Sequence, residues 1–261
     1  AAERLHLSQP AVTKQIQALE QSLQTKLFTY DGHTLHKTEK CLLLERYAIS
    51  QQYQFEELQL AITDKKRLKL RIGATKTIGE FVIVPQIRSF LKNPNHNLEL
   101  VIDNTEILLQ KLEQSEIDFA IIEGVFDKSK YGYHLYKKEQ FIGICAKSHP
   151  FSGKTVLLED VFNQDIVVRE QFSGTRTLMQ NALRDRGFSF ANFKKCTSVN
   201  NFSVICDLIA NNGAITFAYE PISRCRDDLA IFYVSDLQIP GEFNYVYCNE
   251  RVANEKIKLL F

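Results

Sequence analysis

From residue 68 onwards, short apolar strand patterns alternate with amphipathic helix patterns. This alternation predicts an α/β domain of about 190 residues with largely parallel sheets, because a parallel strand requires a crossover, usually a helix, before the next strand. We expect strands at 68–72, 98–102, 118–122, 141–146, 165–169, near Cys196, at 214–218 and at 243–248. Helices are expected at 81–91, 105–114, 174–186, 201–210 and from about residue 252.

Residues 7–23, LSQPAVTKQIQALEQSL, form a helix pattern with two chemically different faces. An apolar stripe at helical spacing predicts a packed face: Val12, Ile16, Leu19 and Leu23. Hydrogen-bonding groups lie on the opposite face. Ser8 is the expected N-cap, and Pro10 falls in the first turn, where its missing N–H costs nothing. With a short helix expected in residues 1–7, the segment predicts a helix-turn-helix, although an ordinary amphipathic surface helix also fits.

Residues 26–37 have the pattern of a β-hairpin. The turn signal Asp31-Gly32 separates two short strand patterns, 26–30 and 34–37. A hairpin directly after a helix-turn-helix is typical of the wing of a winged helix-turn-helix.

Residues 41–64 carry a heptad seam at alternating spacings of three and four: Cys41, Leu44, Ala48, Gln51, Phe55, Leu58 and Ile62. A helix packed on its own domain is one interpretation. A long helix between two domains favours pairing with a second copy of itself, with polar Gln51 fixing the register. The charged cluster 64–67 then predicts a hinge.

The first 48 residues together resemble the winged helix-turn-helix of LysR-type transcriptional regulators, and the resemblance continues through the chain. It implies a winged helix-turn-helix DNA-binding domain at 1–40, a linker or dimerisation helix and hinge at 41–67, and an effector-binding domain at 68–261. The effector domain is expected to have two lobes like those of periplasmic binding proteins: lobe I at 68–145 and 243–261, and lobe II at 146–242.

The resemblance also implies binding to double-stranded promoter DNA by a homodimer, or a dimer of dimers (a homotetramer). The residues expected to reach the major groove or its phosphates are Ser8, Gln9, Pro10, Thr13, Lys14, Gln17, Lys37 and Lys40. The wing departs from the family pattern, because Tyr30 and His33 stand where arginines are usual. Residues 1–40 contain five basic and four acidic side chains, a balance of +1, so the helix is expected to carry most of the recognition.

Three loops beyond predicted strand ends are rich in hydroxyls and cations. Ligands of open α/β sheets bind at such ends, where helix N-termini converge. The residues expected to form an effector site there are Thr75, Lys76, Thr77, Arg169, Ser173, Thr175, Ser198 and Asn200. Cations and helix N-termini favour a small anionic effector. The alternative is that these Ser and Thr side chains only cap helices and turns.

Composition limits the other classes of function. The 261 residues are 44% hydrophobic, with a net charge of +1, which is not the balance of a protein that coats nucleic acid. The sequence has no apolar run of about 18 residues and no export signal, so we expect a cytoplasmic protein without a membrane span. Because the chain does not begin with Met, its natural N-terminus is expected to be missing.

Catalytic and metal-binding signals are weak. The six cysteines form no C-x-x-C pair, so we expect reduced thiols, no metal and no cofactor. The sequence lacks nucleophile-elbow, phosphate-loop and zinc-protease motifs, and its histidines form no acid–base cluster, so we expect no enzyme. A solute-binding protein or an enzyme built on the two-lobed domain is the alternative, but a solute-binding protein would not need residues 1–64.

Overall fold

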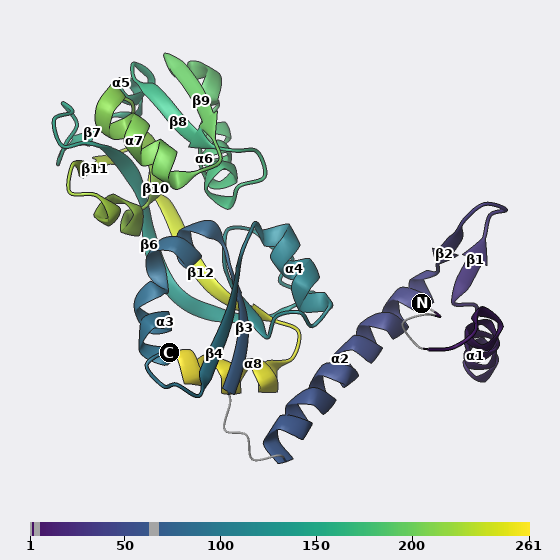
Figure 1. The fold of residues 1–261 in the computed structure, drawn as a ribbon. Helices are drawn as coiled ribbons and strands as arrows, with labels where there is room; N and C mark the ends of the chain where they lie inside the picture. Colours follow the sequence, from purple (N-terminus) through teal and green to yellow (C-terminus); the bar gives the residue numbers. More distant parts are fainter. Residues whose placement is uncertain (1, 3–5, 63–67) are drawn as a thin grey trace. The chain divides into compact units, whose positions relative to one another are not determined.

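The computed structural model describes residues 2, 6–62 and 68–261. The chain divides into two compact units, residues 1–65 and 66–261 (Figure 1). Only residues 2, 6 and 7 of the expected helix at 1–7 are described, and the expected hinge at 64–67 lies entirely outside the described residues. No helix of the described residues is long and apolar enough to cross a membrane.

The first unit contains α1 (Gln9–Ser22), β1 (Phe28–Tyr30), β2 (Leu35–Lys37) and α2 (Glu39–Ile62). Helix α1 begins as predicted, since the Ser8 hydroxyl accepts a hydrogen bond from the Ala11 amide at 3.4 Å. The predicted hairpin is confirmed: β1 and β2 pair antiparallel. Its turn is held by the Asp31 carboxylate, which accepts from the amides of His33 and Thr34.

The packed apolar face predicted for α1 was wrong in part. Val12 and Ile16 are half-buried, but Leu19 and Leu23 are 42% and 46% exposed. The buried side chain of α1 is instead Glu20. Its carboxylate accepts hydrogen bonds from the amides of Leu27 and Phe28 and from Lys26, and these donors replace water. The helix therefore turns its Glu20 side toward the hairpin, and the two leucines stay at the surface.

The second unit combines a large mixed sheet with helices. Its first elements are β3 (Leu68–Ala74), the π-helical turn η2 (Ile78–Val82), α3 (Val84–Phe90), β4 (His96–Ile102), α4 (Thr105–Glu113), β5 (Phe119–Glu123) and β6 (Gly132–Ala146). The following elements are β7 (Thr155–Val156), α5 (Leu158–Phe162), β8 (Asp165–Arg169), α6 (Gly174–Arg184), η3 (Phe190–Asn192) and β9 (Lys195–Val199). The last are α7 (Phe202–Asn212), β10 (Thr216–Tyr219), η4 (Glu220–Cys225), β11 (Leu229–Val234), β12 (Ile239–Tyr247) and α8 (Glu250–Leu260).

The sheet is mixed rather than largely parallel. Its strand order is β4-β3-β5-β12-β6-β11-β7, with β10 also on β6, and β8-β9 form a separate pair. Strands β3, β4 and β5 pair in parallel, as do β8 and β9. All the pairings of β6 and β12 are antiparallel. The expectation of mostly parallel pairing failed because β12 returns along β6 in the opposite direction.

Two strands connect the lobes of the second unit (Figure 1). We call lobe I the part around β3, β4, β5, α3, α4 and α8, and lobe II the part around β7 to β11 and α5 to α7. The 15-residue strand β6 runs from lobe I into lobe II, and β12 runs back beside it. The largest hydrophobic cluster extends through both lobes, from Leu70 and Phe119 to Met179 and Phe232.

Candidate functional site

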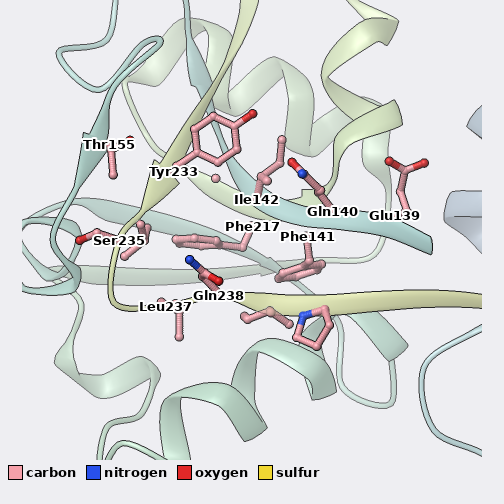
Figure 2. Close-up of a pocket in the computed structure, with 14 residues that line it drawn as sticks. Glu139, Gln140, Phe141, Ile142, Thr155, Phe217, Tyr233, Ser235, Leu237 and Gln238 are labelled. Carbon is pink, nitrogen blue, oxygen red and sulfur yellow. The ribbon is translucent and has the colours of Figure 1, made fainter.

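A large hollow of the second unit lies in lobe II, beside β6 and between the end of β11 and the start of β12 (Figure 2). Its volume is about 780 Å³, and its walls mix apolar side chains such as Phe141 and Leu237 with polar ones such as Glu139, Gln140 and Gln238. Among the described residues that line it, none belongs to the three predicted ligand loops. The volume of this hollow therefore does not identify it as the predicted effector site.

Two of the three predicted loops, those after β3 and β8, meet at a much smaller cavity between the lobes, and the predicted residues Ser198 and Asn200 are not among its lining residues. Its lining residues are Thr75, Lys76, Asp103, Asn104, Thr105, Glu123, Arg169, Glu170, Ser173 and Gly174. They come from the carboxyl ends of β3, β4, β5 and β8 and from the N-terminus of α6. The cavity measures about 20 Å³, which is room for one water molecule. The cleft is therefore closed in this arrangement.

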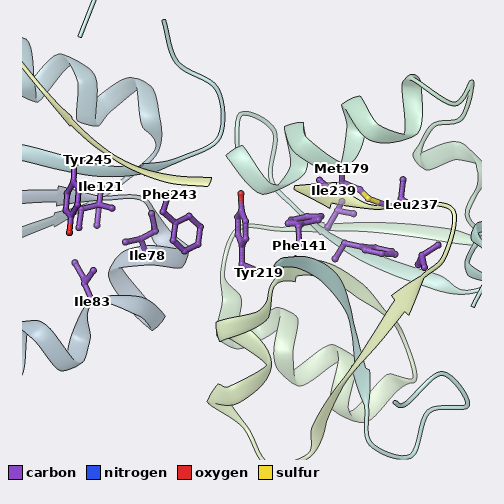
Figure 3. Close-up of a cluster of buried hydrophobic side chains, with 14 of the residues drawn as sticks. Ile78, Ile83, Ile121, Phe141, Met179, Tyr219, Leu237, Ile239, Phe243 and Tyr245 are labelled. Carbon is purple, nitrogen blue, oxygen red and sulfur yellow. The ribbon is translucent and has the colours of Figure 1, made fainter. Parts of the chain in front are cut away.

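An apolar layer underlies the junction of the lobes (Figure 3). The ring of Tyr219 from lobe II packs edge-on against Phe243 of β12 at 4.8 Å between centroids, and against Phe141 of β6 at 5.3 Å. Tyr219 and Phe243 are both fully buried. These aromatic contacts hold the two crossing strands and lobe II together near the cleft.

Lys76 joins the two lobes across the cleft. Its ammonium group donates to the backbone carbonyl of Asn200 at 3.1 Å and lies 3.5 Å from Oε1 of Glu170. Asn200 thus contributes its main chain to this contact.

Arg169 is buried and paired with the residue that follows it. Its Nε and one terminal nitrogen donate to the two carboxylate oxygens of Glu170, at 2.7 and 2.9 Å. The guanidinium also lies over the Phe202 ring, 4.3 Å from its centroid. Burial opposes ionisation of Glu170, but hydrogen bonds to Arg169 and the charges of Arg169 and Lys76 hold its pKa below its ordinary value. The chain's own carboxylate therefore neutralises part of the positive charge in the cleft.

The predicted hydroxyl residues divide into two groups. Thr75 and Ser173 line the cavity, whereas Thr77 and Thr175 are buried behind it. The hydroxyls of Ser173 and Thr175 are 2.8 Å apart. Ser198 is exposed and donates to the carbonyl of Arg169 at 3.3 Å, so it stabilises the end of β8.

Glu123 lines the cavity although it was not among the predicted site residues. It ends β5 with 3% of its surface exposed, and Thr77 Oγ1 donates to its Oε1 at 2.8 Å. Its Oε2 is buried and has no hydrogen-bond partner among the described residues. Burial raises the pKa of Glu123 to about 7, against the opposing effects of the Thr77 hydrogen bond and the Arg169 charge. A glutamate closing a strand of buried residues is the sequence signal that could have identified it.

In the first unit, the outward face of α1 carries the predicted polar residues. Ser8, Gln9, Pro10, Thr13, Lys14 and Gln17 are all exposed. Lys40 is exposed at the start of α2. Lys37 forms an ion pair with Glu45 of α2, with contacts of 2.6 and 2.8 Å, and this pairing raises the pKa of Lys37.

All six cysteines are free thiols, and the described residues contain no cluster of three or more metal-ligating side chains. The buried Cys206 of α7 and the exposed Cys225 of η4 lie with their sulfur atoms 3.7 Å apart.

Two family models match nearly the whole chain. The helix-turn-helix of bacterial regulatory proteins of the lysR family matches residues 1–42, and the LysR substrate binding domain matches residues 63–261. The regulator CysL of Bacillus subtilis is 23% identical over 269 residues, covering all of this chain and 89% of that protein.

Solved structures share the fold. A full-length OxyR from Pseudomonas aeruginosa superposes with a TM-score of 0.70 at 17% identity, covering 99% of this chain and 86% of that one. Full-length CbnR, solved with its target DNA, gives 0.61 at 16% identity, with coverages of 99% and 91%. The regulatory domain of Synechocystis CcmR, solved with 2-PG, gives 0.62 at 17% identity, with coverages of 74% and 95%.

Proposed function

The chain belongs to the LysR family of bacterial transcriptional regulators, and on this basis we propose that α1 reads promoter DNA while the inter-lobe cleft takes a small anionic effector. Such a protein acts in the cytoplasm, where the promoter is, and it regulates rather than catalyses. Ligand binding changes regulation only if the effector has different affinities for two arrangements of the protein.

The outward face of α1 carries the DNA proposal. Gln9 and Gln17 are both exposed, about two turns apart along α1, and a glutamine can pair bidentately with adenine in the major groove. Lys14 and Lys40 offer positive charge to phosphates. Lys37 can do so only by leaving Glu45. The complex of CbnR with its target DNA, in a protein of the same fold, supports this assignment.

Gel shifts with promoter fragments test the DNA proposal. Replacing Gln17 by Ala should weaken specific binding by about 1–3 kcal/mol, roughly 5- to 150-fold, and relax base preference. The matched control is Gln15→Ala, because Gln15 is also exposed on α1 but lies away from the Gln9–Gln17 face. Equal affinity and base preference for all three proteins would refute the assignment.

We further propose that α2 pairs with a second copy of itself, giving a homodimer or a dimer of dimers. The seam residues Phe55, Leu58 and Ile62 are 58%, 53% and 72% exposed on the single chain. A row of large apolar side chains at heptad spacing is stable in water only when another surface covers it.

The effector proposal rests on the meeting of Lys76, Arg169 and the N-terminus of α6 at one cavity. Helix N-termini and cations both favour anions. Because Glu170 now pairs with both cations, an anionic effector must replace this carboxylate and open the closed cleft. The 2-PG complex of the CcmR regulatory domain supports a ligand in this fold.

Thermal unfolding with a panel of small anions tests the effector proposal. A bound anion at about 100 times its Kd should stabilise the protein by roughly 2.7 kcal/mol. Arg169→Met should lose this response, whereas Arg184→Met, at the exposed end of α6, should keep it. The proposal fails if no anion shifts the wild-type transition.

A further inference from the structure

We propose that Glu123 contacts the anionic effector as a neutral carboxylic acid, so that binding of the effector takes up one proton. The proposal rests on the proposed function, because it concerns the same cleft. It assigns to Glu123 the role of a hydrogen-bond donor that selects an anion with an acceptor oxygen at the cleft floor.

The geometry of Glu123 leaves one oxygen for a ligand. Glu123 lines the cavity, and its Oε1 accepts a hydrogen bond from Thr77 Oγ1. Its Oε2 is buried and has no hydrogen-bond partner among the described residues. A buried polar atom without a hydrogen bond is destabilising, because it has lost its contact with water and gained no other partner. A ligand atom that bonds to Oε2 would remove this cost, so the orphaned oxygen is itself an indication of a binding position.

The N-terminus of α6 places an anion beside this carboxyl group. A Cβ on Gly174, the first residue of α6, would lie 3.1 Å from the Glu123 carbonyl oxygen and 3.7 Å from its Cγ. An anion bound by the amides of this helix end would therefore be a close neighbour of the Glu123 side chain. Two negative charges at this distance repel strongly in a buried site.

The charged groups around Glu123 do not remove this conflict. Lys76 and Arg169 face it from the β3 loop and β8, but both contact Glu170 here and would contact the effector once it displaced that carboxylate, so they balance the charge of the effector and not that of Glu123. Glu80 of η2, Asp103 after β4 and the Tyr219 hydroxyl group add no positive charge. None of the six histidines is among the described residues that line the cavity.

Protonation of Glu123 resolves the repulsion. The neutral acid has an O–H group, and Oε2–H can donate to an oxygen of the anion. Burial already brings the pKa of Glu123 to about 7, so the proton is available near neutral pH. An adjacent anion raises the pKa further, because it disfavours the charged carboxylate. A carboxylic acid kept neutral by its surroundings in order to donate a hydrogen bond is an established use of glutamate and aspartate.

Titration calorimetry on the full chain tests this inference. The probes are sulfate, glycolate and succinate between pH 6.5 and 8.5, where each keeps nearly one charge state. Affinity should fall as pH rises above about 7, by up to tenfold per pH unit. In two buffers of different ionisation enthalpy, the observed heat should report uptake of up to one proton at pH 8.

Variants separate Glu123 from its neighbours. Glu123→Gln keeps a donor but cannot titrate, so its affinity should not vary with pH. Glu80→Gln is the control, since burial also raises the pKa of Glu80 but this residue does not line the cavity, and it should keep the wild-type pH dependence. The proton uptake of the wild type decides the question even if Glu123→Gln fails to fold.

The outcomes distinguish the two proposals. Affinity that is equal at all pH values, or that rises with pH, overturns the role of Glu123 while the anion site stands. A rise with pH would mean that an ionised Glu123 accepts a hydrogen bond from the ligand. Absence of binding for every probe at every pH overturns the anion site and this inference together.

Discussion

In the second unit, large side chains such as Phe119, Phe232 and Phe243 are fully buried, whereas in the first unit Leu19, Leu23 and most of the α2 seam lie at the surface. Both units contain apolar residues at regular spacing. The second unit has a sheet and flanking helices to receive them, whereas the described residues of the first unit form α1, one hairpin and the long helix α2. Apolar periodicity thus predicts a face that another surface covers, and for the α2 seam we propose that a second copy of the chain provides that surface.

The largest effect that we expect from this contrast is the loss of stability when a core side chain of the second unit is truncated. Phe232→Ala should lower the free energy of unfolding by about 3–5 kcal/mol, because the ring packs against Phe151, Phe217 and Gly143. Leu43→Ala on α2, where the side chain is 62% exposed, should cost within about 0.5 kcal/mol. Urea denaturation followed by circular dichroism measures both. Similar losses for the two variants would remove the contrast between the units.

The seam of α2 should matter for assembly rather than for folding. Leu58→Lys places a charge in the proposed dimer contact and should weaken it by about 2 kcal/mol or more, roughly 30-fold. Leu43→Lys adds the same charge at an exposed position on the face of α2 away from the seam and should leave assembly unchanged. Sedimentation equilibrium of the full chain gives both dissociation constants. If Leu58→Lys assembles like the wild type, the exposed seam has another role.

The smallest expected effect is a change in hydrogen exchange at the start of the hairpin in the first unit. Glu20→Gln should speed hydrogen exchange of the Leu27 and Phe28 amides several-fold, because both donate to this carboxylate. Glu39→Gln, at the exposed start of α2, should not. Unchanged exchange in Glu20→Gln would show that the buried carboxylate does not hold the hairpin.

The pH dependence of this contact has a definite sign. Hydrogen bonds from Lys26 and from the Leu27 amide lower the pKa of Glu20. A carboxyl group with a lowered folded-state pKa stabilises the fold above its ordinary pKa and loses that contribution as pH falls through the lowered value. Exchange at Leu27, corrected for its intrinsic pH dependence, should therefore lose protection only in acid.

Sequence patterns located most elements that have strong local signals. The strand at 165–169 was predicted with its observed bounds, because DIVVR is an apolar run between polar residues. The first part of β6, GYHLYKKEQ, was missed because its polar side chains hide the strand pattern. Strand β7 has only two residues and exists because β11 pairs with it. The predicted helix at 81–91 begins instead at Val84, since Pro85 fits a first helical turn.

The sequence predicted which loops form the candidate site, but not which contacts their residues make. Sequence placed Lys76 and Arg169 at strand ends, and the structure brings both to one cavity. It could not indicate that the carboxylate of Glu170 folds back onto Arg169, since neighbouring residues along a strand usually point to opposite faces. Nor could it reveal that Asn200 contributes a carbonyl, because every residue type has one.

The pairing of β6 with β12 determines how the cleft can move. The two strands are hydrogen-bonded from residue 132 to residue 141, with a bulge between Phe243 and Asn244. Lobes joined by a ladder cannot slide apart as separate bodies without breaking it, so an opening of the cleft would have to twist the two strands, and the bulge is where their ladder is already interrupted. β12 leads directly into α8, which packs on α3. Because β12 and α8 are consecutive, a twist of the crossing strands would shift α8 against α3, at the side of lobe I away from the cleft.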